Sequence, residues 1–177
     1  MAYADLTTIQ ATDPGDPLTA AWCDQVRDNE EFFIDPPTCA IYSSSAQSVS
    51  TNTVTALTAD SERFDNDSMH STSSNTSRIT IQTEGRYLLG CVVRFAFFAA
   101  VQPRLVQFRF NGNASTVVNV GQLGSVPDTV TVRDTIISGA TAEVFTAGDY
   151  IEVTARQETG GSLNVTLDNF FAIFLTR

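Results

Sequence analysis

His70 is the side chain of this sequence best suited to general acid–base chemistry, because histidine alone titrates near neutral pH without perturbation. It is the only histidine, and it lies in a polar stretch, residues 65–77, rich in serine, asparagine and aspartate. The histidine of a Ser–His–Asp triad must be oriented by a fixed partner, and this stretch offers no buried setting. We therefore expect His70 to have no catalytic role and the protein not to be an enzyme.

The same stretch begins with the closest match to a metal site. Asp65, Asn66 and Asp67 present side-chain oxygens at the close spacing that calcium loops use. The glycine at the sixth position and the bidentate glutamate of an EF-hand are missing. Asp65 and Asp67 are therefore weak metal candidates, a solvated loop is the simpler interpretation, and no cofactor is expected.

Three cysteines could support redox or metal chemistry. Cys23, Cys39 and Cys91 are an odd number and contain no CxxC spacing, whereas zinc sites and disulfide frameworks use more ligands at tighter spacing. We expect small, buried apolar residues. A Cys39–Cys91 bridge stays open, because both residues fall in expected strands.

Charge and hydropathy exclude two classes of partner. The formal net charge is -10, there is no lysine, and the cations are single arginines scattered along the chain. Nucleic-acid binding relies on clustered cations, so we expect no such partner.

The longest apolar stretch, residues 88–101, is interrupted by Arg94 and falls short of the roughly 20 residues of a membrane span. The first residues lack the features of a signal peptide, so we expect the protein to be made in the cytoplasm of its producing cell.

Residues 1–37 form the first of two expected regions. Asp16 and Pro17 are typical of a helix start, and Leu18, Ala21, Trp22, Val26 and Phe33 fall roughly on one helical face up to residue 33. Residues 35–37, Asp-Pro-Pro, end this helix. An isolated helix of this length is marginal, so we expect an arm that packs on another surface.

Residues 38–177 contain strand-length segments divided by turn residues. Many short strands with frequent turn signals predict an all-β antiparallel sandwich or barrel. The expected strands are residues 38–43, 53–57, 77–82, 87–98, 104–110, 115–120, 129–137, 150–157 and 169–176.

Two of these strands are apolar on both faces. Segments 104–110 and 150–157 alternate apolar with polar residues, which predicts one buried and one wet face. Segments 87–98 and 169–176 have apolar residues at both parities. A second apolar face must be covered by the N-terminal helix or by another subunit. One short helix is small beside two such strands, and large exposed apolar patches usually mark interfaces, so we expect self-association. Parity alone does not decide which face meets the partner, and we assign one face as interface candidates: Tyr87, Leu89, Phe95, Phe170 and Phe174.

Residues 38–177 resemble the C1q/tumour-necrosis-factor (TNF)-like jelly roll. The similarity lies in Glu84-Gly-Arg-Tyr-Leu-Leu, in Arg109-Phe-Asn-Gly, in residues 146–153 (TAGDYIEV) and in residues 170–175 (FFAIFL), together with residues 63–66 followed by 77–79. The resemblance implies a tight homotrimer in which one sheet packs around the three-fold axis. The sequence shows no collagen-like stalk.

Residues 18–37 resemble the opening of tailed-phage virion proteins, in which a leader and one helix precede a β-domain. Together the two regions predict a trimeric capsid decoration protein on the virion surface. Its partner is the phage major capsid protein or another virion protein, bound through Leu18, Trp22, Val26 and Phe33. The alternative is a tail-fibre or receptor-binding module that recognises a host glycan or protein.

Overall fold

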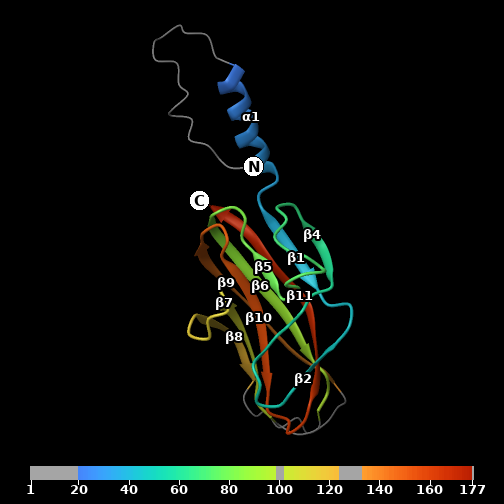
Figure 1. Ribbon diagram of the computed structural model, residues 1–177. Helices are drawn as coiled ribbons and strands as arrows, with labels where there is room; N and C mark the ends of the chain where they lie inside the picture. Colours follow the sequence, from blue (N-terminus) through green and yellow to red (C-terminus); the bar gives the residue numbers. More distant parts are fainter. Residues whose placement is uncertain (1–19, 99–101, 124–132, 177) are drawn as a thin grey trace. The chain divides into compact units, whose positions relative to one another are not determined.

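The computed structural model describes residues 20–98, 102–123 and 133–176 (Figure 1). The chain divides into two compact units, Met1–Pro37 and Thr38–Arg177. The first unit contains helix α1, Ala20–Ile34, and the expected helix start at Asp16, Pro17 and Leu18 lies outside the described residues. No helix in the described part of the chain is long and apolar enough to span a membrane.

The second unit is built from two antiparallel sheets, one six-stranded and one five-stranded. The β11 sheet has the order β4 (Ser61–Asp65), β1 (Thr38–Tyr42), β11 (Leu163–Thr176), β6 (Gly85–Phe95) and β9 (Thr135–Phe145), with β2 (Gln47–Val49) also paired to β11. The β10 sheet has the order β3 (Thr55–Ala56), β10 (Tyr150–Gln157), β7 (Arg104–Phe110) and β8 (Val117–Leu123), with β5 (Arg78–Thr80) also paired to β10.

The core lies between the two sheets and is rich in aromatic rings. Tyr87, Phe95 and Phe170 are completely buried. The Phe108 ring from the β10 sheet lies 5.9 Å from the Phe170 ring of the β11 sheet, measured between centroids. Such contacts between residues far apart in sequence bring the two sheets together, because each fully buried aromatic side chain contributes about 2–3 kcal/mol of hydrophobic free energy.

This core corrects the expected interface residues. Tyr87, Leu89, Phe95 and Phe170 are 0% exposed and Phe174 is 9% exposed. They alternate along β6 and β11 with half-buried and exposed residues. They therefore fill the interior of one subunit, and the face of these strands that is open to a second copy is the opposite one.

The expected wet face of segment 150–157 is also corrected. Ile151, Val153 and Ala155 point into the core as expected, but Glu152 is 4% and Thr154 is 1% exposed on the other face. β10 is a central strand, flanked by β7 on one side and by β3 and β5 on the other. Side chains from these neighbours cover its outer face.

Cys39 and Cys91 are buried, free thiols. Cys39 lies opposite Ala172 of β11, and Cys91 lies opposite Phe170 on the other edge of the same strand. β11 therefore separates the two cysteines, and neighbouring strands are about 4.8 Å apart. This separation of two strands exceeds the reach of a disulfide.

Candidate interaction surface

The outer face of the β11 sheet turns away from the core and is predominantly apolar. The register of four strand pairs aligns one row of outward side chains across the whole sheet. This row consists of Phe64, Ala40, Phe171, Gly90 and Ala140. A second row consists of Thr38, Ile173, Leu88 and Ala142. Both rows cross β1, β11, β6 and β9, so the outward-facing residues are mainly apolar across these four strands, although Ala40 and Gly90 are themselves covered by their neighbours.

Several large apolar side chains of this face are open to solvent. Exposed fractions are 69% for Val144, 59% for Ile136, and 49% for both Phe64 and Leu175. We call the whole surface the outer apolar face; it comprises Ala40, Phe64, Leu88, Gly90, Val92, Ile136, Ala140, Ala142, Val144, Phe171, Ile173 and Leu175. Contiguous exposed apolar surface of this kind marks interaction sites in soluble proteins.

Gly90 leaves the middle of the outer apolar face without a projecting side chain. A Cβ atom at this position would lie 2.2 Å from the Phe171 ring. The ring therefore lies over the backbone of β6, where any larger residue would displace it. Gly90 and Ala140 on the next strand have no side chain or a small one, so few atoms project from this part of the sheet. A second sheet or loop can therefore approach its backbone closely.

One polar group on the same surface lacks a partner. Asn169 follows a register shift between β11 and β6 and lies opposite Val92. Its Oδ1 atom is buried and has no hydrogen-bond partner among the described residues. Buried acceptors are nearly always satisfied, so this atom is a candidate acceptor for a donor from another molecule.

Paired charges border the outer apolar face at this end. The Arg94 Nε atom donates to Asp168 Oδ2 at 3.0 Å, and Arg63 donates to the Asp168 carbonyl oxygen at 3.2 Å. The hydrogen bond and charge of Asp168 raise the pKa of Arg94. An apolar centre with a polar rim is the usual anatomy of a protein–protein interface.

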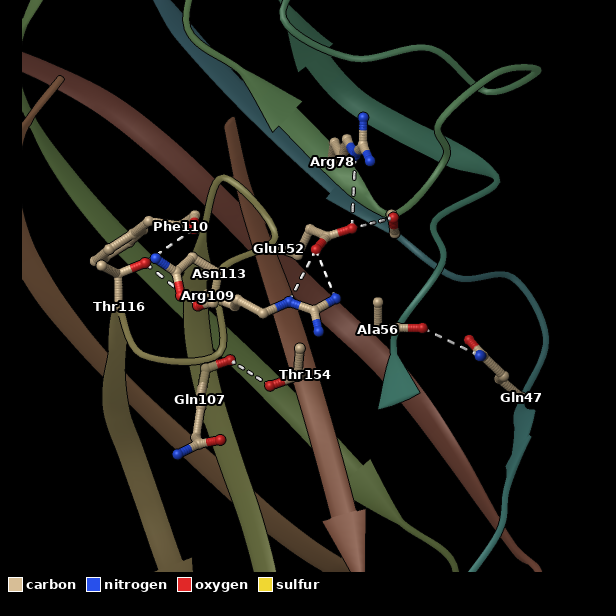
Figure 2. Close-up of polar contacts among 11 residues, drawn as sticks. Gln47, Ala56, Arg78, Gln107, Arg109, Phe110, Asn113, Thr116, Glu152 and Thr154 are labelled. Atoms are coloured by element: carbon tan, nitrogen blue, oxygen red, sulfur yellow. Dashed lines mark hydrogen bonds and ion pairs between the residues drawn. The ribbon is translucent and has the colours of Figure 1, made fainter. Parts of the chain in front are cut away.

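The outer face of the β10 sheet carries a cluster of paired polar side chains around Glu152 (Figure 2). Glu152 Oε2 accepts hydrogen bonds from Arg109 Nε at 3.1 Å and Arg109 Nη2 at 2.7 Å, and Oε1 accepts from Ser77 at 2.8 Å. Arg78 Nε lies 3.6 Å from Oε1, and its guanidinium lies 4.0 Å from the centre of the Tyr150 ring. Because every oxygen of Glu152 is engaged, this cluster joins β5, β7 and β10 rather than presenting a reactive carboxylate. The alternating pattern of segment 150–157 did not indicate this cluster, because it predicts a solvent-exposed Glu152.

Of the two weak metal candidates, Asp65 is the last residue of β4 and Asp67 lies in the loop that follows. Asp65 accepts backbone hydrogen bonds from Asp67, Met69 and His70 at 3.3, 3.0 and 2.8 Å, so it organises the loop. The Asp67 Oδ2 atom is buried without a hydrogen-bond partner in the described part of the chain. Within that part, no three His, Cys, Asp or Glu side chains are grouped to hold a metal ion. His70 contacts the Arg78 carbonyl oxygen through Nδ1 at 2.8 Å.

The expected docking residues divide into three groups. Leu18 lies outside the described residues. Trp22 and Val26 are half-buried on α1, whereas Phe33 is 71% exposed. Phe32 is 5% exposed and replaces Phe33 as the buried aromatic of the helix.

Solved structures with a similar architecture are known. The globular domain of zebrafish complement 1qA matches with a TM-score of 0.53 at 11% identity, over 80% of this chain and 98% of that one. The fold is a C1q/TNF-like jelly roll. The Eiger TNF from S. frugiperda matches the same jelly roll with a TM-score of 0.50 at 13% identity, over 79% of this chain and 94% of that one. No protein-family model and no curated protein matches the sequence.

Proposed function

We propose that this jelly roll is a self-associating structural protein whose copies meet through the outer apolar face. The exposure of Ile136, Val144 and Leu175 on one sheet, together with the unsatisfied Asn169 acceptor of the same sheet, carries this proposal. Among the residues that the structure describes, β7, β8 and β10 carry no exposed large apolar side chain, and the Glu152 cluster occupies the outer face of their sheet. A homotrimer is the assembly implied by the C1q/TNF-like resemblance, and it buries one sheet of each copy while the other faces water.

The trimer, in this proposal, decorates the surface of a phage virion. Residues 1–37 form a separate unit from the jelly roll, and α1 resembles the single helix that opens tailed-phage virion proteins. Three such arms on one trimer would bind neighbouring capsid proteins with a gain from effective concentration, even if each arm binds weakly. The protein would then act by binding and bridging, without catalysis.

The oligomeric state of the full chain tests the first step. Light scattering at micromolar concentration should give about three times the 19.1 kDa chain mass. Replacing Ile173 in the middle of the outer apolar face by arginine should shift the mass to that of a monomer, because the interface would have to bury an unpaired charge.

Leu105→Arg is the matched control. Leu105 is also half-buried and lies on β7, opposite Arg156, on the outer face of the β10 sheet. This variant should keep the mass of the unsubstituted chain. A monomeric unsubstituted protein, or dissociation by Leu105→Arg but not by Ile173→Arg, would reject the assigned face.

A further inference from the structure

A polar cavity of about 260 Å³ lies in the jelly roll, and none of its lining residues belongs to the outer apolar face. It is formed by the segment between β1 and β2 together with the first residue of β2, by the segment between β3 and β4, and by one residue that precedes β5. Its polar lining consists of Ser43, Ser45, Gln47, Thr58, Asp60 and Thr76. All of these residues belong to one subunit, so the cavity does not depend on the proposed trimer.

Hydrogen bonds hold the charged side of this cavity in place. Asp60 Oδ1 accepts from the Ser44 backbone at 2.8 Å and from the Ser61 hydroxyl at 2.9 Å, and Oδ2 accepts from the Ser44 hydroxyl at 2.6 Å. These bonds lower the pKa of Asp60. Its carboxylate is therefore charged at neutral pH and fixed in orientation, although it is exposed to solvent.

The amide side of the cavity is equally fixed. Gln47 Oε1 accepts from the Thr58 backbone at 3.0 Å and from its hydroxyl at 3.2 Å, and Gln47 Nε2 donates to the Ala56 carbonyl oxygen at 3.2 Å (Figure 2). The backbone of Ala59 donates to the Thr76 carbonyl oxygen at 2.8 Å. A site whose polar groups are already positioned loses little entropy when a ligand binds.

Two hydroxyl groups of the lining are unused. The side chains of Ser45 and Thr76 make no hydrogen bond to another described residue, and Asp60 Oδ2 accepts only one. The cavity therefore offers free donors together with a charge-assisted acceptor. Its unused polar groups can bind a ligand without breaking the bonds that hold the loops.

The composition of the lining restricts the ligand class. Asp60 is its only charged residue and it contains no aromatic ring. Phosphates and carboxylates would be repelled, and a largely apolar ligand would find only Ala46 and Ala59 as apolar contacts. One carboxylate falls short of the several oxygen ligands, commonly including more than one carboxylate, that calcium prefers. An uncharged molecule rich in hydroxyl groups satisfies both the carboxylate and the free hydroxyls.

We propose that this cavity binds one monosaccharide unit of a glycan, with Asp60 accepting hydrogen bonds from sugar hydroxyls. The cavity is slightly smaller than the roughly 300–1,000 Å³ of pockets for drug-sized ligands, which suits a single ring. Its openness to solvent and lack of an aromatic platform limit a single site to affinities of about 1 mM or weaker. Three sites on one trimer would bind a surface glycan more tightly through effective concentration.

Amide NMR spectra of the full chain test this site. The isotope-labelled protein is titrated separately with D-glucose, D-galactose and N-acetyl-D-glucosamine, each up to about 50 mM. At least one sugar should produce saturable shifts concentrated in residues 43–47, 58–61 and 76. Asp60→Asn should weaken that binding at least fivefold, because a charge-assisted hydrogen bond becomes a neutral one.

Two further variants keep the proposal falsifiable if Asp60→Asn perturbs the loop. Ser45→Ala removes a hydroxyl without an internal partner and should weaken sugar binding at least twofold. Asp149→Asn removes a carboxylate that accepts from Thr146 and Asn111 in a different turn, and should leave binding unchanged. Absence of saturable shifts with all three sugars, shifts centred elsewhere, or saturable shifts with CaCl₂ alone would each overturn the assignment.

Discussion

At the scale of single residues, burial divides the three cysteines into two chemical classes. Cys23 is exposed on α1, whereas Cys39 and Cys91 are buried. Burial raises the pKa of Cys91 to about 12 and raises that of Cys39 further, with help from the nearby charges of Asp65 and Glu62. Because the thiolate is the reactive form, Ellman's reagent at pH 8 should modify one thiol per native chain and three after denaturation.

The same burial predicts a pH dependence of stability. The thiol of an unfolded cysteine has a pKa of about 8.5, below that of buried Cys91. Above about pH 9 the unfolded chain therefore loses a proton that the folded chain keeps, so the free energy of unfolding falls as pH rises towards 12. Replacing Cys91 by alanine should flatten this decline between pH 9 and 11 in denaturant titrations. Rapid labelling of all three thiols in the native protein would contradict the assigned burial.

At the scale of elements, Glu152 connects three strands of the β10 sheet. Its carboxylate pairs with Arg109 of β7 and Arg78 of β5, and its side chain is 6% exposed. Glu152→Ala would leave two arginines without their shared partner, which costs about 3 kcal/mol for a buried pair. Thermal unfolding should therefore show a melting temperature lower by roughly 6–12 °C.

A second ion pair, between Arg156 of β10 and Glu158 just after that strand, provides the control. Arg156 and Glu158 are 2.7 Å apart, but their side chains are 36% and 32% exposed. Solvent screens such a pair, so Glu158→Ala should change stability by less than about 1 kcal/mol. Equal losses for the two variants would show that burial of Glu152 adds nothing to its interactions.

The sequence predicted the strands with strong periodicity and missed those without it. Segments 104–110 and 150–157 have the bounds that were expected. Residues 129–132 of the segment predicted at 129–137 lie outside the described residues, and its end overlaps β9, Thr135–Phe145. The strand extends past residue 137, where the prediction stopped, because its centre, Ser-Gly-Ala-Thr-Ala, carries small residues that packing selects but hydropathy does not mark. β4 was not expected, since three of its five residues are exposed. β11 begins at Leu163 rather than residue 169 because the irregularity at Asp168 interrupts the alternation.

The candidate sites were predicted only in part, for related reasons. Two-faced hydropathy correctly identifies β6 and β11 as strands with a second apolar face. Parity alone does not distinguish the inner from the outer face of a sandwich, so the residues predicted for the interface are those of the core face. The polar cavity beside Asp60 is not marked in the sequence, because Ser45 and Thr76 look like ordinary loop residues. Only the fold brings them next to Asp60.

At the scale of the whole molecule, the two units differ in whether they have a hydrophobic core of their own. Among the described residues, Phe32 is the only buried apolar side chain of the first unit, and all others belong to the jelly roll. A single helix of 15 residues is marginal in water by itself. The jelly roll has an extensive core of its own, so it should fold without residues 1–34.

Deletion of residues 1–34 therefore separates assembly from docking. The truncated protein should keep the oligomeric mass and melting temperature of the full chain, because the core and the outer apolar face both lie beyond residue 38. It should no longer bind purified phage particles that lack the protein, as measured by co-sedimentation, since the proposed docking segment is absent. Trp22→Ala in the full chain should weaken attachment severalfold, because buried aromatic side chains dominate interface energies.

The alternative outcomes assign the arm to different roles. Co-sedimentation of the truncated protein with particles would move the docking surface to the jelly roll and favour its loops as the contact. A Trp22→Ala variant whose trimer melts early would instead make α1 part of the folded core. Retained mass and melting temperature together with lost attachment fit only an arm that orders on its partner, which is how a short segment binds a large surface without stability of its own.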